Sequence, residues 1–331
     1  MPLDPPVEEL IFPPNHRLLE LQLMNRWSTV TYKSLCTKVA EDDHVWQVKV
    51  PAMSLHYDFL LNGLFALSAF EVASSSENGY ARYLRAAVEY QTQALSSFMP
   101  QLHDITPNSF EAILCFSMML MVLALASAQF ASDSESGECA SMVRSTITHF
   151  ELLRGCTTVL ESKKNYIAES PYIRKLKRFE ELPRAALDSR TETALAKLSE
   201  VNERRITSSI GESYESRVRH ISYWEACKKA ILLLRENYEK CVDIDYQGYV
   251  LGWLNMAGDD YIKAIKADDR IALLILMYWG VLIEKLGHQA WWARRFGGLL
   301  VQEISNRELN EDTDMAAKDI ILWAQELIQA R

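Results

Sequence analysis

The chain has 331 residues, of which 49% are hydrophobic and 24% charged, and its formal net charge is -9. This composition is typical of a soluble globular protein, and the acidic balance opposes non-specific attraction to nucleic acid or to an anionic membrane. The low counts of 12 glycines and 10 prolines favour long helices over a turn-rich β fold.

Helical periodicity dominates the first half of the chain. Residues Phe59 to Val72 are apolar almost all round, as in a buried helix. Tyr80 to Phe98 carries apolar side chains at the i, i+3, i+4, i+7 spacing of one helix face, and Pro100 ends this pattern. Met142 to Leu153 predicts a further amphipathic helix, with Gly155 as its C-terminal glycine.

The most apolar stretch runs from Ala112 to Ser132 and contains no formal charge. Its length approaches the roughly 20 apolar residues that cross a bilayer. Acidic residues flank it at Asp104, Glu111 and Asp133, however, and no cluster of basic residues or aromatic belt marks a membrane interface. We therefore predict a buried core helix and no membrane span.

The second half of the chain begins with a polar region and then returns to strong helical stripes. We predict that 183–216 is a mobile surface insertion, with a weak helix around Ala194 to Val201 as the alternative. Further helices are predicted over Val218–Tyr238, Val250–Ala257, Tyr261–Ile265, Ile271–Leu286, Trp291–Ile304 and Met315–Ile328. Because no alternating strand pattern occurs, we predict one all-α domain over 1–331, with about ten to twelve helices and an internal apolar pocket.

Sequence motifs of nucleotide binding and of common hydrolases are absent. The chain contains no G-x-x-x-x-G-K-[ST], G-x-G-x-x-G, H-E-x-x-H or G-x-S-x-G pattern. The 7 histidines show no metal-ligand spacing, and the 6 cysteines lie far apart. We therefore predict no metal and no cofactor.

Aromatic and sulfur-bearing side chains crowd the last part of the chain. For each one, plain core packing is the simplest interpretation, whereas the group together suggests a pocket between helices for a hydrophobic small molecule of terpenoid, sterol or polyketide type. The candidate ligand-binding residues are Phe65, Met119, Leu123, Trp253, Met256, Tyr278, Trp279 and Trp291.

Three side chains are candidate catalytic proton donors. His56 and Tyr57 precede an apolar helix, and Arg294 follows a pair of tryptophans close to His288. Alternatives stay open for each position. His56 also fits a structural core or cap histidine, and Arg294 or Arg295 also fits stacking on a neighbouring indole ring.

Several stretches, in a fixed order, carry a resemblance to a known family. They are LMNRWSTVTYKSL, WQVKVPAMSLHYDFLLNGLFALSAF, RYLRAAVEYQTQALSSF, ITPNSFEAILCFSMMLMVLALA and DDRIALLILMYWGVLIEKLGHQAWWARRFGGLLVQEI. Together they resemble the regulatory domain of fungal zinc-cluster transcription factors of the sterol uptake control type. The resemblance implies an all-helical domain whose C-terminal half holds a sterol in an apolar pocket. The closely spaced cysteines with which that family reads DNA do not occur in this sequence, so we expect no direct DNA binding.

Two functions follow from this resemblance. The first is a cofactor-independent pericyclase of fungal secondary metabolism, similar to the hetero-Diels-Alderases of tropolonic sesquiterpene pathways. Such an enzyme joins a polyketide-derived quinone methide to a terpene largely by holding the two in a reactive pose. The second is a ligand-sensing transcriptional regulator, or a carrier, without its own DNA-binding domain. We favour the first, with a cytoplasmic location; the second implies the nucleus, and either allows a homodimer.

Overall fold

The structure is a computed structural model. It describes residues 15–37, 40–75, 80–131, 141–161, 163, 165, 181–208, 214–241, 247–309 and 313–329. Helices with short 3-10 and π-helical turns account for the regular structure of these residues, and no strand occurs among them. The predicted all-α fold class is therefore confirmed.

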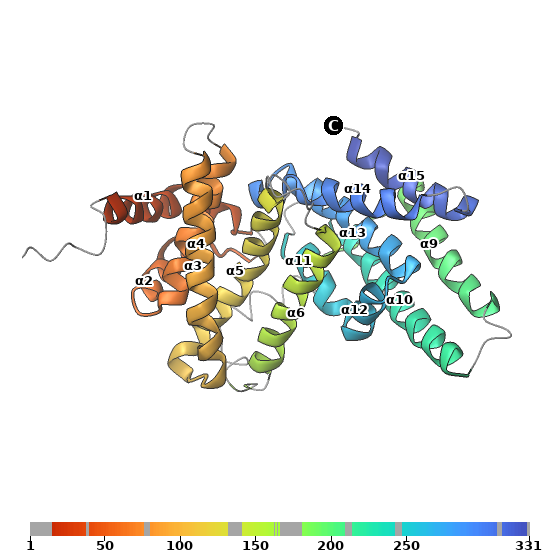
Figure 1. The fold of residues 1–331 in the computed structure, drawn as a ribbon, viewed down its shortest axis with the longest axis horizontal. Helices are drawn as coiled ribbons and strands as arrows, with labels where there is room; N and C mark the ends of the chain where they lie inside the picture. Colours follow the sequence, from red (N-terminus) through yellow and green to blue (C-terminus); the bar gives the residue numbers. More distant parts are fainter. Residues whose placement is uncertain are drawn as a thin grey trace, which may run out of the picture.

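The N-terminal lobe is built around one helix that is apolar on nearly every side. Its helices are α1 (Asn15–Thr29), α2 (Val50–Ser54), α3 (Asp58–Ser75) and α4 (Tyr80–Phe98). Most of α3 is buried, in agreement with the pattern over Phe59–Val72, and α4 packs along it (Figure 1). The Arg26 side chain of α1 donates two hydrogen bonds, of 2.5 and 2.7 Å, to the buried Glu71 carboxylate of α3. This ion pair fixes α1 on the lobe.

Helix α5 (Pro107–Ala131) stands between the two ends of the molecule, beside α6 (Met142–Glu161) (Figure 1). By length and composition its segment Pro107–Phe130 could cross a membrane, but 89% of its most apolar stretch of 18 residues is buried inside the protein. Its Phe116 ring lies so close to α3 that a Cβ atom at Gly63 would come within 2.7 Å of it. The structure thus agrees with the predicted core helix.

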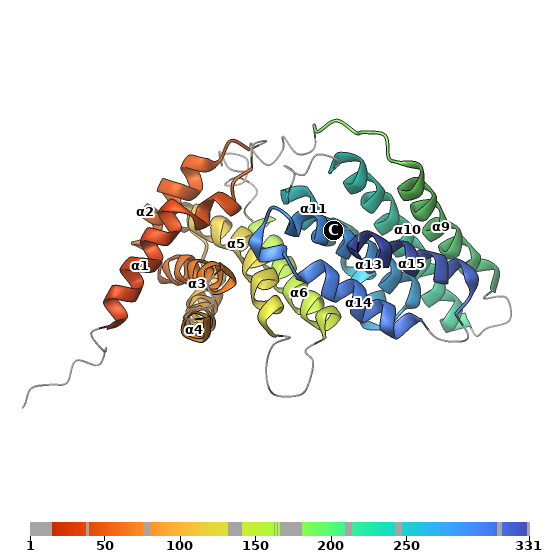
Figure 2. The ribbon, with the colours of Figure 1, turned by 90° about the horizontal axis from the view of Figure 1, so that it is seen from above.

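The C-terminal lobe surrounds a second, mostly apolar helix, α13. Its helices are α9 (Ser189–Ser208), α10 (Tyr214–Lys240), α11 (Gln247–Ala257), α12 (Asp259–Lys266), α13 (Arg270–Gly287), α14 (Phe296–Glu308) and α15 (Met315–Gln329). Nearly every residue of α13 is buried, because the other helices of the lobe pack around it (Figure 2). Asp269 begins α13 by accepting a 3.0 Å hydrogen bond from the backbone N–H of Ala272.

The region 183–216 differs from the mobile surface insertion that we predicted. Residues 189–208 form α9, and Ala194, Leu195 and Leu198 are buried against the rest of the C-terminal lobe. Residues 189–208 therefore have the conformation of the helix alternative, and residues 209–213 lie outside the described part of the chain. With α9 and the short α2, the described residues contain thirteen α-helices, slightly more than the expected ten to twelve.

Candidate functional site

The aromatic group of the C-terminal lobe is part of its core. The indole rings of Trp253 and Trp279 stack with centroids 6.1 Å apart, and both side chains are almost completely buried. Trp253 donates from Nε1 to the carbonyl of Ala230 at 3.2 Å, and Trp279 donates to that of Val250 at 2.9 Å. Since the fold itself uses both indole N–H groups, a ligand here would contact only ring faces.

The remaining candidate ligand-binding residues are spread over several helices. Phe65 lies on α3 and packs against the Tyr90 ring at 5.2 Å, and Met119 and Leu123 are fully buried on α5. Tyr278 is buried on α13, and Met256 is half-buried on α11. The structure therefore divides the predicted ligand-binding set between the two lobes and does not gather it around one cavity that we describe.

Trp291 belongs to a contact that joins the two lobes. It lies in the 3-10 turn η4 (Trp291–Ala293), and its Nε1 donates to the Ser34 hydroxyl at 3.0 Å. Trp292 donates from Nε1 to the carbonyl of the same Ser34 at 3.0 Å. Gln129 of α5 holds η4 from the other side, because its amide donates to the Trp292 carbonyl and accepts from the Arg295 N–H. We call this set of contacts the lobe junction.

A cavity of about 610 Å³ opens beside the lobe junction, at the C-terminal end of α13. Its lining residues are Glu284, Gly287, His288, Arg294 and Arg295. Glu284 is only 8% exposed and accepts a 2.8 Å hydrogen bond from the N–H of Gly298. The cavity, which we call the junction pocket, thus offers one carboxylate and two guanidinium groups to a ligand.

Two glycines allow the backbone segments around the junction pocket to approach each other closely. A Cβ atom at Gly287 would lie 2.7 Å from the Cα of Arg294, and one at Gly297 would lie 2.3 Å from the backbone nitrogen of Glu284. Both positions therefore need glycine because two backbones approach each other closely there. This approach directs the chain after α13 back along the same helix and places Arg294 next to His288.

The three candidate catalytic residues do not form one site. Arg294 lines the junction pocket with its exposed side chain. His56 is exposed between α2 and α3 in the N-terminal lobe. The Tyr57 hydroxyl donates to the carbonyl of Asn108 at 3.0 Å, which ties the start of α3 to the start of α5. Tyr57 therefore has a structural partner, and only Arg294 lies in a described cavity.

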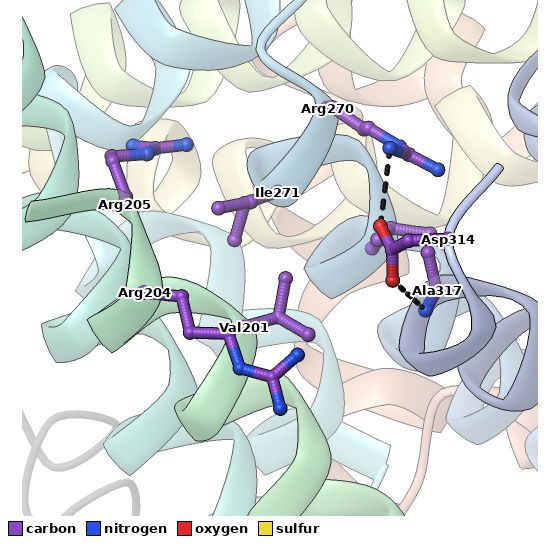
Figure 3. A pocket seen from close by; sticks show the side chains of 8 residues that line it. Val201, Arg204, Arg205, Arg270, Ile271, Asp314 and Ala317 are labelled. Carbon is purple, nitrogen blue, oxygen red and sulfur yellow. Dashed lines mark hydrogen bonds and ion pairs between the residues drawn. The ribbon is translucent and has the colours of Figure 1, made fainter. Parts of the chain in front are cut away.

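A second cavity, of about 530 Å³, lies where α9, α13 and α15 meet (Figure 3). It is lined by Val201, Arg204, Arg205, Arg270, Ile271, Leu274, Asp314 and Ala317, and we call it the arginine pocket. None of these residues was predicted from the sequence as a site residue. The adjacent pair Arg204 and Arg205 was the available signal, but it fell in the region expected to be a mobile insertion.

The charges of the arginine pocket are partly balanced by acidic neighbours. Arg205 pairs with Asp269 at 2.5 Å, and both side chains are largely buried. Arg270 lies 3.4 Å from a carboxylate oxygen of Glu308 and 3.4 Å from one of Asp314. Burial raises the pKa of Glu308 above its ordinary value. Arg204 pairs with Glu200, so every arginine that lines the pocket has a carboxylate partner.

Metal binding has no support from the described residues. Across these parts of the chain, no group of three or more histidine, cysteine, aspartate or glutamate side chains is arranged to hold a metal ion. Both pockets instead present basic side chains, which suit anionic or hydrogen-bonding groups of an organic ligand.

Comparison with known proteins gives partial matches to fungal regulators. A Zn(2)-C6 fungal-type transcription factor of Gibberella zeae is 28% identical over 165 residues, which are 48% of this chain and 33% of that protein. Sterol uptake control protein 2 of Candida albicans is 23% identical over 120 residues, which are 36% of this chain and 16% of that protein. No protein-family profile matches the chain. The aligned part is thus a third or less of each relative.

These matches support the broader resemblance to fungal transcription factors. Both relatives carry names of regulators, in agreement with the resemblance seen in the sequence. Neither match supports the hetero-Diels-Alderase interpretation. The regulator, which we had considered second, therefore becomes the better supported function.

Proposed function

We propose that the chain is a regulatory domain of the fungal transcription-factor type, whose effect on transcription changes when a small molecule binds. The pair of partial matches to transcriptional regulators carries this proposal, and the all-helical fold is compatible with it. The proposal places the protein in the nucleus and assigns no DNA contact to these residues, whose net charge is -9.

The lobe junction provides a physical route from a ligand to a regulatory response. Trp291 and Trp292 hold Ser34 from the N-terminal side of the chain, and the next residues, Arg294 and Arg295, line the junction pocket. A ligand that contacts Arg294 would change the contact with Ser34 if it bound more tightly to a second arrangement of η4 than to this one. Such a difference is the condition for a ligand to shift a conformational equilibrium.

The ligand of this proposal is a hydrophobic small molecule that carries at least one polar group. The buried Glu284 carboxylate accepts hydrogen bonds, and Arg294 donates them. The tryptophans of η4 are not among the lining residues, because Trp292 is fully buried in the core and Trp291 packs against it. The pocket therefore supports the polar contacts of the ligand, whereas its hydrophobic part rests on the partial match to a sterol uptake control protein.

Neither partial match supports the pericyclase interpretation. A hydrogen-bond donor beside the bound substrates would assist such a reaction, and we had nominated His56, Tyr57 and Arg294 for this role. His56 is exposed on the N-terminal lobe, Tyr57 is bound to Asn108, and Arg294 lies at the junction pocket of the other lobe. No candidate pair of donor groups therefore meets in one cavity that we describe.

The experiment uses the full chain fused to a heterologous DNA-binding module that controls a reporter gene. Lipophilic fractions from fungal cells are added, and we expect one fraction to change the reporter signal. Arg294→Ala should require about tenfold more of that fraction, which is the effect of losing one charged hydrogen bond. Arg190→Ala is the control, because Arg190 is an exposed arginine that pairs with Glu326 and lines neither pocket.

The same fractions also distinguish the two functions. They are incubated with the purified chain and examined by mass spectrometry for converted products. A reporter signal that stays constant with every fraction, together with a new cyclised product, would reject the regulatory domain in favour of the enzyme. A fraction-dependent reporter signal without any converted product would support the regulatory domain.

A further inference from the structure

The arginine pocket is separate from the site used in the proposed function. Arg270 and Ile271 lie in the first turn of α13, whereas Glu284 and His288 of the junction pocket lie at its other end. The two groups are thus separated by about 20 Å along the helix axis. Their lining residues do not overlap, so an inference about the arginine pocket does not depend on the proposed function.

The basic groups of the arginine pocket come from two sides of it. Arg204 and Arg205 approach from α9, while Arg270 and Asp314 lie across the pocket from them (Figure 3). Among the lining residues, three are arginines and one is an aspartate. Glu200, Asp269 and Glu308 also pair with these arginines, so an anionic ligand has to replace one of these partners. Guanidinium groups bind carboxylate and phosphate oxygens through paired hydrogen bonds.

The arginines differ in how far the fold already uses them. Arg205 already forms a 2.5 Å ion pair with the largely buried Asp269. Arg270 lies 3.4 Å from its two carboxylate partners, farther than the roughly 2.7–2.9 Å of a strong charged hydrogen bond. Arg204 is 61% exposed and pairs with Glu200 on its own helix. Arg204 and Arg270 can therefore turn toward a ligand at little cost to the fold.

Apolar side chains form the floor between these charges. Val201 and Ile271 lie between the α9 arginines and Asp314 (Figure 3), and Leu274 and Ala317 complete the apolar lining. The cavity volume of about 530 Å³ falls in the range of small-molecule sites. The ligand that fits is therefore charged at one end and apolar along its body.

We propose that the arginine pocket binds a small amphipathic organic anion, whose charged group lies between Arg204 and Arg270 and whose apolar body covers Val201 and Ile271. The charged group is a carboxylate or a phosphate monoester, because both accept the planar guanidinium donors. A neutral ligand of the same shape would leave these donors without an anion, and a bare inorganic anion would leave the apolar floor uncovered.

Titration calorimetry on the purified full chain tests both parts of this proposal. The probes are decanoate, decyl phosphate, decanol and inorganic phosphate, and the amphiphiles are kept below the concentrations at which they aggregate. We expect decanoate, decyl phosphate or both to bind, and decanol and inorganic phosphate to bind at least tenfold more weakly. Comparing decanoate with decyl phosphate then identifies which anion the pocket prefers.

Two substitutions locate the binding. Arg204→Gln removes an exposed charge and should weaken the anion about tenfold, the loss expected for one charged hydrogen bond. Val201→Phe fills the cavity from a half-buried position without changing charge and should weaken binding at least as much. The matched controls are Arg190→Gln on the same helix and Leu322→Phe, a 49% exposed position on α15. Both controls should bind like the wild-type chain.

Four results would overturn the proposal. Decanol that binds as tightly as decanoate would show that the charge has no role, and inorganic phosphate that does so would remove the role of the apolar floor. Unchanged affinity in both Arg204→Gln and Val201→Phe would place the ligand elsewhere. Failure of all probes to bind would also reject the arginine pocket, without affecting the reporter experiment above.

Discussion

Replacement of Gly297 by alanine should destabilise the protein, although alanine is the better helix former. A Cβ atom at this position would lie 2.3 Å from the backbone nitrogen of Glu284 and 2.4 Å from the carbonyl oxygen of Gly280. Both distances are at least 1 Å shorter than the 3.4 Å at which ordinary contact begins. Because the atoms in the way belong to a helix backbone, α13 and α14 must move apart.

Two opposing contributions set the change in the free energy of unfolding of Gly297→Ala. Overpacking of a core costs about 1–3 kcal/mol, and the upper end applies here because no flexible side chain can give way. The gain in helix propensity from glycine to alanine is about 1 kcal/mol. The free energy of unfolding of Gly297→Ala should therefore fall by about 2 kcal/mol, which urea denaturation followed by far-UV circular dichroism would measure.

Gly155, which we predicted to end its helix, lies inside α6 (Met142–Glu161) and is the matched control for this substitution. It lies on an exposed part of the helix, and a Cβ atom there would meet nothing within 4 Å. Gly155→Ala should therefore raise the free energy of unfolding by up to about 1 kcal/mol. If Gly297→Ala were as stable as Gly155→Ala, the close approach of α13 and α14 described above would be wrong.

Three further predictions concern charged and buried groups. Glu71→Gln should lower the free energy of unfolding by about 1–2 kcal/mol, measured in urea, because it breaks the partly buried pair with Arg26. Hydrogen bonds from Thr191 lower the pKa of Asp188. The stability that the ionised Asp188 adds is therefore complete above the unfolded pKa of about 3.9 and is lost as the pH falls through the lower folded pKa. Asp188→Asn should make the free energy of unfolding less dependent on pH over this acid range. Burial raises the pKa of the Cys227 thiol to about 12, so this thiol should stay unlabelled by a disulfide reagent at pH 8 until the chain unfolds, and labelling of the native protein as fast as in urea would contradict its burial.

The sequence was most informative where a helix is buried on all sides. The segments Phe59–Val72 and Ile271–Leu286 are apolar almost all round, and they form the centres of α3 and α13. In α9 the apolar stripe is narrow and most positions are polar, so composition alone favoured a loop. The buried Leu195 and Leu198 outweigh this composition because they pack on the rest of the lobe.

The sites were less predictable because each of them combines distant segments. The arginine pocket takes Arg204 from α9 and Arg270 from α13, and no local pattern joins these two residues. Arg294 was nominated with its neighbour His288 because both flank the tryptophan pair, and both line the junction pocket. Glu284 was missed because it lies within the most apolar helix of the lobe, where its backbone contact with Gly297 depends on tertiary packing.

The two hydrogen bonds that end on Ser34 span 257 and 258 residues of the chain. During synthesis, Ser34 leaves the ribosome long before Trp291 and Trp292 exist. Because domains are made from the N-terminus at roughly 5–20 residues per second, the surface that receives these indoles stays uncovered for about ten seconds or more. The contact that joins the two lobes therefore forms only after most of the chain has been made.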